Sequence, residues 1–195
     1  MDLNTLQTLP KREIYTGLGE IIKYGIIYDA RFFQYLEDNI EQVASLANEA
    51  AAHMTARSCE IKADVVSQDE KELGLRAILN FGHTAAHAIE KNTGYTKYNH
   101  GEAVAIGMVC AAYISKALGM IDQSVVDRVI SLILKLHLPI KAQGCTVEDL
   151  YRDIFHDKKT VGGKVKWILM ESIGQVCGNS NVPEEIVKGA MQKIV

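Results

Sequence analysis

The sequence predicts a mostly α-helical, bundle-like fold with one short β-hairpin near residues 164–178. Three observations indicate this fold. Most of the chain repeats apolar side chains at helical spacing. Only three prolines interrupt the 195 residues, and each stands where a helix tolerates one. The stretch KVKWILM at 164–170 instead begins with alternating side chains and carries Val, Trp and Ile, so together with GQVCG at 174–178 it predicts the hairpin.

The first part of the chain is predicted to form five helices in succession. Pro10 precedes the first periodic stretch, as a proline does at the start of a helix. Gly94 and Gly119 stand where C-terminal glycine caps belong, so they end the fourth and fifth helices. The predicted ranges are 10–28, 30–38, 45–67, 74–92 and 100–118.

The second part is predicted to form three more helices around the hairpin. Asp122 can cap the helix that Pro139 follows, and Thr146 with Asp149 resembles a capping box. Pro183 fits the first turn of the last helix. The predicted ranges are 122–137, 146–156 and 183–194. Because no repeat, low-complexity tract or linker divides the sequence, we expect one domain over residues 1–195.

Composition excludes several classes of protein. With 21 Lys and Arg against 24 Asp and Glu, the net charge of −3 lacks the basic excess that general nucleic-acid binding needs. No apolar run approaches the roughly 18 residues of a membrane span, and the N-terminus lacks a signal-peptide pattern, so a cytoplasmic location is expected. The four cysteines form no CxxC pair, which argues against a disulfide framework or a thiolate zinc site.

A polar stripe marks the predicted helix 74–92. Its polar members follow one another at steps of four, three and four residues, which places them within an arc of about 60° on a continuous helix. The other faces of this helix are apolar nearly all round, and a solvent face would carry Lys and Glu more than His and Asn. The stripe is therefore interpreted as part of a site. Its members are Arg76, Asn80, His83 and His87.

The histidines suggest a metal site. His83 and His87 have the i, i+4 spacing of two metal ligands, but Thr84 stands where a zinc protease of the HExxH type has its general-base Glu, so that class is disfavoured. His100 begins another predicted helix among small residues that allow close packing. Two imidazoles and one carboxylate would form an open catalytic zinc site.

The carboxylate of such a site is left open by the residues alone. The candidates are Glu20, Glu90 and Glu102. Glu20 stands out because it lies in the apolar stretch 18–27. Its alternative interpretation is an exposed i, i+3 ion pair with Lys23, which would be worth a few tenths of a kcal/mol.

Four segments together resemble the C-terminal domain of 3-dehydroquinate synthase, in the sugar-phosphate cyclase superfamily. They are GLGEIIKYGIIYD at 17–29, IKADVVSQDEKELGLRAILNFGHTAAHAIE at 61–90, HGEAVAIGM at 100–108 and DKKTVGGKVKWILMESIG at 157–174. The resemblance implies a helical metal domain that packs against an N-terminal NAD-binding domain, with the active site between them. This sequence has no Gly-rich dinucleotide fingerprint, so the NAD-binding domain is expected to be absent from this chain.

The resemblance also implies roles for individual residues. It assigns the metal ligands to Glu20, His83 and His100. It makes His87 an active-site histidine near the substrate phosphate and the transferred proton. It matches the groups that hold the substrate's carboxylate, hydroxyls and phosphate to Lys23, Lys62, Arg76, Asn80 and one lysine of the pair Lys158 and Lys159, of which we expect Lys159. The implied cofactors are Zn²⁺, with Co²⁺ as a substitute, and NAD bound mainly by the other domain.

Two departures from the family pattern lie between these residues. Ala85 and Ala86 replace an aromatic-glycine pair, and Gly19 replaces the usual Ala before the ligand Glu. Neither departure removes a residue with an implied role, so they bear on local packing more than on chemistry.

The reaction implied by the resemblance converts 3-deoxy-arabino-heptulosonate 7-phosphate to 3-dehydroquinate and phosphate in the shikimate pathway. The chain alone is expected to be inactive, because no residue in it can accept a hydride. The expected partners are a sugar-acid phosphate substrate, an N-terminal NAD-binding domain and a second copy in a homodimer. The alternatives are another sugar-phosphate cyclase, a metal-dependent polyol or glycerol dehydrogenase, and a metal-binding domain without turnover.

Overall fold

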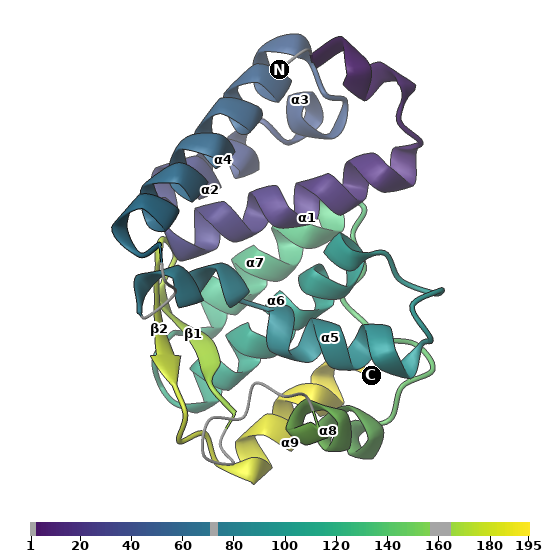
Figure 1. Cartoon of the computed structure of the whole chain (residues 1–195), viewed down its shortest axis with the longest axis vertical. Helices are drawn as coiled ribbons and strands as arrows, with labels where there is room; N and C mark the ends of the chain where they lie inside the picture. The colour runs from purple at the N-terminus through teal and green to yellow at the C-terminus, as the bar shows by residue number, and fades with distance from the viewer. Residues whose placement is uncertain (1–2, 71–73, 157–164) are drawn as a thin grey trace.

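In the residues that the structure describes, the regular elements are helices and one hairpin, which confirms the predicted fold class (Figure 1). The computed structural model describes residues 3–70, 74–156 and 165–195. The 3₁₀ helices are η1 (Leu3–Thr8) and η2 (Leu75–Asn80). The α-helices are α1 (Lys11–Ile27), α2 (Ala30–Asp38), α3 (Ile40–Ala44), α4 (Asn48–Gln68), α5 (His83–Asn92), α6 (His100–Ala117), α7 (Gln123–Lys135), α8 (Val147–His156) and α9 (Glu184–Ile194). The strands are β1 (Trp167–Ser172) and β2 (Gln175–Asn179).

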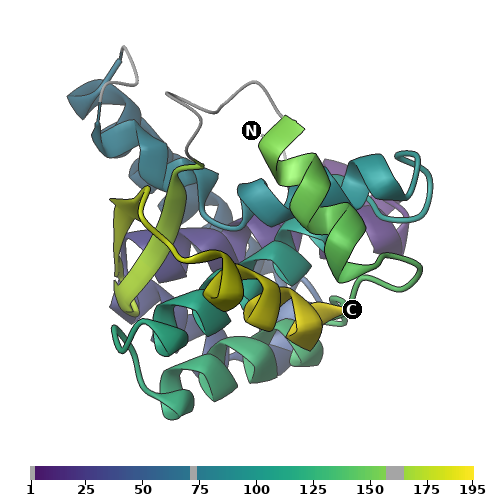
Figure 2. The same ribbon diagram turned by 90° about the horizontal axis from the view of Figure 1, so that it is seen from below.

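Helix α6 lies at the centre of the molecule. It packs against α1, α5, α7, α9 and β1, and its stretch 103–112 is buried throughout. A helix that is apolar on every face is stable only when other elements surround it. Helices α2, α3 and α4 lie beyond α1 on one side of this centre, while α8 and α9 pack together on the opposite side (Figures 1 and 2).

The hairpin is antiparallel and packs on α6. Trp167 pairs with Asn179 and Leu169 with Cys177. The backbone N–H of Met170 donates to the buried Oγ of Ser115 on α6, at 2.9 Å. The hairpin therefore joins the core through a satisfied polar contact as well as through apolar side chains.

The predicted helix 74–92 is wrong as a single element. It is divided into η2 and α5 at Gly82, whose φ is +79°. Gly82 lies directly on α6, because a Cβ added to Gly107 would come 2.0 Å from the Gly82 carbonyl oxygen. The chain turns sharply to make this contact, so Arg76 and Asn80 do not continue the helical face of His83.

Smaller differences concern helix ends. The short elements η1 and α3 were not predicted, and α4 begins three residues later than expected. Asp122 occupies the N-cap position of α7, but within the described part of the chain its side chain makes no capping bond. The predicted cap at Thr146 is present, because its Oγ1 accepts from the N–H of Asp149 at 3.1 Å. Within the described residues, no helix has the length and hydropathy that crossing a lipid bilayer would require.

Candidate metal centre

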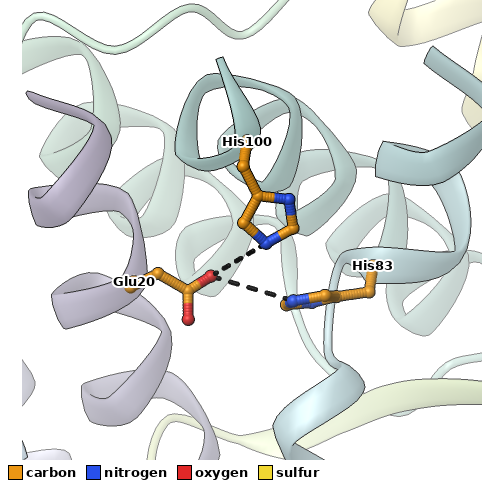
Figure 3. Close-up of side chains that lie close together, drawn as sticks. All are labelled: Glu20, His83 and His100. Atoms are coloured by element: carbon orange, nitrogen blue, oxygen red, sulfur yellow. Dashed lines mark ion pairs between the residues drawn. The ribbon is translucent and has the colours of Figure 1, made fainter. Parts of the chain in front are cut away.

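Three side chains meet where α1, α5 and α6 come together (Figure 3). Glu20 comes from α1, while His83 and His100 are the first residues of α5 and α6. The Nε2 atoms of both histidines lie 3.8 Å from Oε1 of Glu20. Each of the three residues offers one possible ligand atom, a histidine nitrogen or a carboxylate oxygen. These three atoms all lie within 4.8 Å of one another.

Close contacts between helix backbones bring these residues together. Gly19 and Gly101, the sequence neighbours of Glu20 and His100, lie where α1 touches α6. A Cβ added to Gly101 would lie 2.0 Å from the carbonyl oxygen of Thr16, and one added to Gly19 would lie 2.6 Å from that of Gly101. The contact between Gly82 and Gly107 fixes the start of α5 on α6 in the same way. Each of the three residues is thus the sequence neighbour of a glycine at which its helix makes close contact with another helix.

Glu20 uses its two oxygens differently. Oε2 accepts a hydrogen bond from Nζ of Lys23 at 2.6 Å, whereas Oε1 is buried and has no hydrogen-bond partner among the described residues. Burial raises the pKa of Glu20, but the charge and hydrogen bond of Lys23 outweigh it and hold that pKa below its usual value. Leaving an ionised oxygen buried and unpaired is costly. The atom therefore fits a bound cation.

Glu20 does form the i, i+3 ion pair with Lys23, but this pair is not exposed on the surface as the alternative interpretation expected. The Lys23 side chain is only 4% exposed. Burial lowers the pKa of its ammonium group, Glu20 opposes that shift, and the charge of Lys62 adds to it. A buried lysine held by one oxygen of Glu20 leaves the other oxygen directed at the histidines.

Both histidines direct Nε2 toward Glu20 because Nδ1 has another partner. In His83, Nδ1 lies 3.0 Å from the carbonyl oxygen of Phe81. Burial, together with the charge of Lys23, lowers the pKa of His83 to about 4. His83 is therefore neutral near pH 7, which is the state that a metal ligand requires.

The other two candidate carboxylates have different partners. Glu102 completes the capping box of α6 with Asn99 and forms an ion pair with Arg12 at 2.7 Å. Glu90 lies behind His100, with Oε1 3.0 Å from Nδ1. Of the three candidates, Glu20 is the one that faces both Nε2 atoms.

The residues matched to substrate binding are only partly gathered around this centre. The ring of His87 lies edge-on to that of His83, with centroids 5.9 Å apart. Lys62 is exposed on α4 and close enough to Lys23 to influence its pKa. The side chain of Arg76 donates to the carbonyl oxygen of Glu70 at 3.0 Å.

Asn80 is partly buried at the end of η2, which packs against α1 and α4. Lys159 lies outside the described residues.

The structural neighbours of this fold are sugar-phosphate cyclases. ValA, the 2-epi-5-epi-valiolone synthase of Streptomyces hygroscopicus subsp. jinggangensis 5008, was solved with NAD⁺ and Zn²⁺ bound. The match covers 99% of this chain and 54% of the ValA chain, with a TM-score of 0.89 and 25% sequence identity. A 2-deoxy-scyllo-inosose synthase complexed with carbaglucose-6-phosphate, NAD⁺ and Co²⁺ matches 96% of this chain and 54% of its own with a TM-score of 0.80. At 22% identity, the second likeness shows the fold alone.

Sequence comparison identifies the particular family. Residues 17–160 match the family model described as 3-dehydroquinate synthase C-terminal, and the chain belongs to this family. The 3-dehydroquinate synthase of Shewanella sp. (strain MR-4) is 47% identical over 189 residues, 96% of this chain and 53% of the relative. That of Synechocystis sp. (strain ATCC 27184 / PCC 6803 / Kazusa) is 47% identical over 194 residues, 98% of this chain and 54% of the relative. The chain thus spans about half the length of these relatives, which are enzymes.

Proposed function

We propose that this chain is the metal- and substrate-binding domain of a 3-dehydroquinate synthase. The complete catalytic unit would be a lyase that converts 3-deoxy-arabino-heptulosonate 7-phosphate to 3-dehydroquinate and phosphate. One observation carries this proposal: in a member of this family, the unpaired Oε1 of Glu20 faces the Nε2 atoms of His83 and His100.

Glu20, His83 and His100 would hold a zinc ion. Two neutral imidazoles and one carboxylate suit zinc and leave coordination positions for substrate, and cobalt is a plausible substitute. When bound, zinc would polarise the substrate hydroxyl that is oxidised and the ketone that results.

The chain's own residues would bind the anionic substrate and move its protons. Lys23 and Lys62 supply positive charge beside the centre, and an ammonium group neutralises carboxylate or phosphate oxygens. His87 is adjacent to His83, a position from which it could exchange a proton with bound substrate. We propose phosphate- and carboxylate-binding roles for Arg76, Asn80 and Lys159 as well.

Hydride transfer would require NAD, which we propose is bound by an N-terminal NAD-binding domain outside these 195 residues. We therefore expect the 195-residue chain to be inactive alone and to gain activity when a matching NAD-binding half is added. Joining two separate halves costs association entropy, so activity should appear only at high concentrations of both. Turnover by this chain alone with NAD would contradict this division of roles. A homodimer and a cytoplasmic location remain predictions.

Zinc binding by ligand variants tests the metal centre. Glu20→Gln, His83→Ala and His100→Ala should each lose zinc to a competing chelator that the parent chain resists. His53→Ala is the matched control, because His53 lies against Tyr35 with ring centroids 4.3 Å apart and takes no part in the centre. Equal zinc retention by the ligand variants and the control would refute the assignment.

Substrate assays of the reconstituted enzyme distinguish the alternative functions. Conversion of the heptulosonate phosphate supports the proposal, whereas conversion of another sugar phosphate alone would indicate a different cyclase. Oxidation of a polyol without phosphate release would indicate a dehydrogenase. Zinc binding without turnover of any of these compounds would indicate a metal-binding domain that is not catalytic.

A further inference from the structure

Glu90 is a buried carboxylate in direct contact with His100. It lies near the end of α5, and its side chain is 11% exposed. Its backbone carbonyl oxygen accepts from the N–H of Tyr95 at 2.8 Å, which secures the turn that follows α5. Its carboxylate Oε1 lies 3.0 Å from Nδ1 of His100. Removing a carboxylate from water is costly, so its placement here calls for a specific contact.

The contact determines which nitrogen of His100 carries the proton. An ionised carboxylate only accepts hydrogen bonds, so Nδ1 must be the donor. In the neutral ring, Nε2 then keeps its lone pair, and Nε2 is the atom that faces Oε1 of Glu20. His83 shows the same arrangement, with the carbonyl oxygen of Phe81 in the place of Glu90.

The two histidines differ in how firmly packing holds them. The His83 side chain is 14% exposed, whereas that of His100 is 48% exposed. Surrounding atoms can fix the ring of His83, but they leave much of the His100 ring in solvent. A hydrogen bond to a buried acceptor is therefore more important for the orientation of His100 than for that of His83.

We propose that Glu90 is a positioning residue of the metal centre, which sets the tautomer and the ring orientation of His100 through Nδ1. The inference rests on the proposed metal-binding function and adds a residue outside the set of ligands. Removing such an outer partner typically weakens metal binding by about 10–100-fold. Glu90→Met should have an effect of this size, because Met fills a similar space without an acceptor oxygen.

The tautomer can be measured without metal. Nitrogen-15 NMR of the metal-free chain at about pH 8, where histidine side chains are ordinarily neutral, should find the proton on Nδ1 in both His83 and His100. In Glu90→Met, His100 should lose this preference while His83 keeps it and serves as an internal reference. A parent chain whose His100 carries the proton on Nε2 would overturn the proposal, whatever the variants do.

Zinc competition completes the test. Asp153→Asn is the matched control, because Asp153 is 10% exposed and its carboxylate contacts Lys91 and Asn92 on the same helix α5 instead of His100. We expect Glu90→Met to bind zinc about 10–100-fold more weakly than this control, and Glu90→Gln to recover most of the loss because it keeps an acceptor oxygen. Equal affinity of Glu90→Met and the control would overturn the proposal. If the parent binds no zinc, the proposed metal centre fails separately, and the tautomer measurement alone decides whether Glu90 orients His100.

Discussion

Replacing Gly101 by Ala should disturb the contact between α1 and α6 and the metal centre together. The added Cβ would lie 2.0 Å from the carbonyl oxygen of Thr16, whereas ordinary van der Waals contact begins at 3.4 Å. The two helices would have to separate by about 1.4 Å at this point. The obstacle is backbone on both sides, so rotation of a side chain cannot relieve it.

The free energy of unfolding should fall by about 1–3 kcal/mol, the usual cost of overpacking a core. The higher helix propensity of Ala offsets at most about 1 kcal/mol of this loss. The separation also moves Glu20 from α1 away from His100 on α6. Because metal–ligand distances lie within about 0.2 Å of their ideal values, a displacement of this size should lower zinc affinity together with stability.

Urea unfolding and zinc competition measure the two effects. Gly17→Ala is the matched control. Gly17 lies within α1 and is exposed, and among the described residues no neighbouring atom lies within 4 Å of an added Cβ. That variant should gain about 0.5–1 kcal/mol of stability from helix propensity and bind zinc as the parent does. A Gly101→Ala chain with parental stability and zinc affinity would refute the reasoning.

Three further predictions concern charge. Burial raises the pKa of Asp29, but hydrogen bonds from the first turn of α2 and the ion pair with Arg57 outweigh it, so its pKa lies below the usual value. The stabilisation from Asp29 should therefore be complete above about pH 4 and disappear as the pH falls through the lowered pKa. In Asp29→Ala the free energy of unfolding should change less with pH in the acid range. An unchanged pH dependence in this variant would contradict the prediction. Lys23→Met should lower the free energy of unfolding by about 1–3 kcal/mol, because it leaves the carboxylate of Glu20 without its partner. Added zinc should restore part of this loss, which thermal unfolding measures. If zinc raises the unfolding temperature of Lys23→Met by the same amount as that of the double variant Lys23→Met with Glu20→Gln, the prediction is wrong. Inorganic phosphate should shift the NMR signals of His87 before those of distant residues, and a first response elsewhere would contradict the proposed anion site.

The fold class and most helices could be predicted because their signals are local. Helical periodicity located α1, α2 and α6, and Gly94 and Gly119 end helices with the positive φ values expected of such caps. The division at Gly82 could not be predicted, because it depends on contact with Gly107 in another helix. No local pattern reveals such a contact between segments that are distant along the chain.

The candidate site was predictable in its residue types but not in its geometry. Spacing indicated His83 and His87 as ligands, and His100 was added because it begins another predicted helix among small residues. Among the described residues, the structure groups His83 with His100 and Glu20 and leaves His87 outside. The sequence also left three carboxylates open, because the exposure of a side chain depends on tertiary packing. The structure distinguishes them: Glu20 faces both Nε2 atoms and Glu90 contacts Nδ1 of His100. Nothing in the sequence separates a ligand from a residue that orients a ligand, since both are carboxylates near histidines.

X-ray absorption at the zinc edge of the zinc-loaded chain tests the central claim most directly, because it reports which atoms coordinate the metal. The proposed centre predicts two imidazole nitrogens at about 2.0–2.1 Å and oxygen ligands from a carboxylate and water, without sulfur. In His100→Ala, the imidazole signal should fall from two rings to one. Sulfur at about 2.3 Å, or a spectrum that His100→Ala leaves unchanged, would contradict a centre formed by Glu20, His83 and His100.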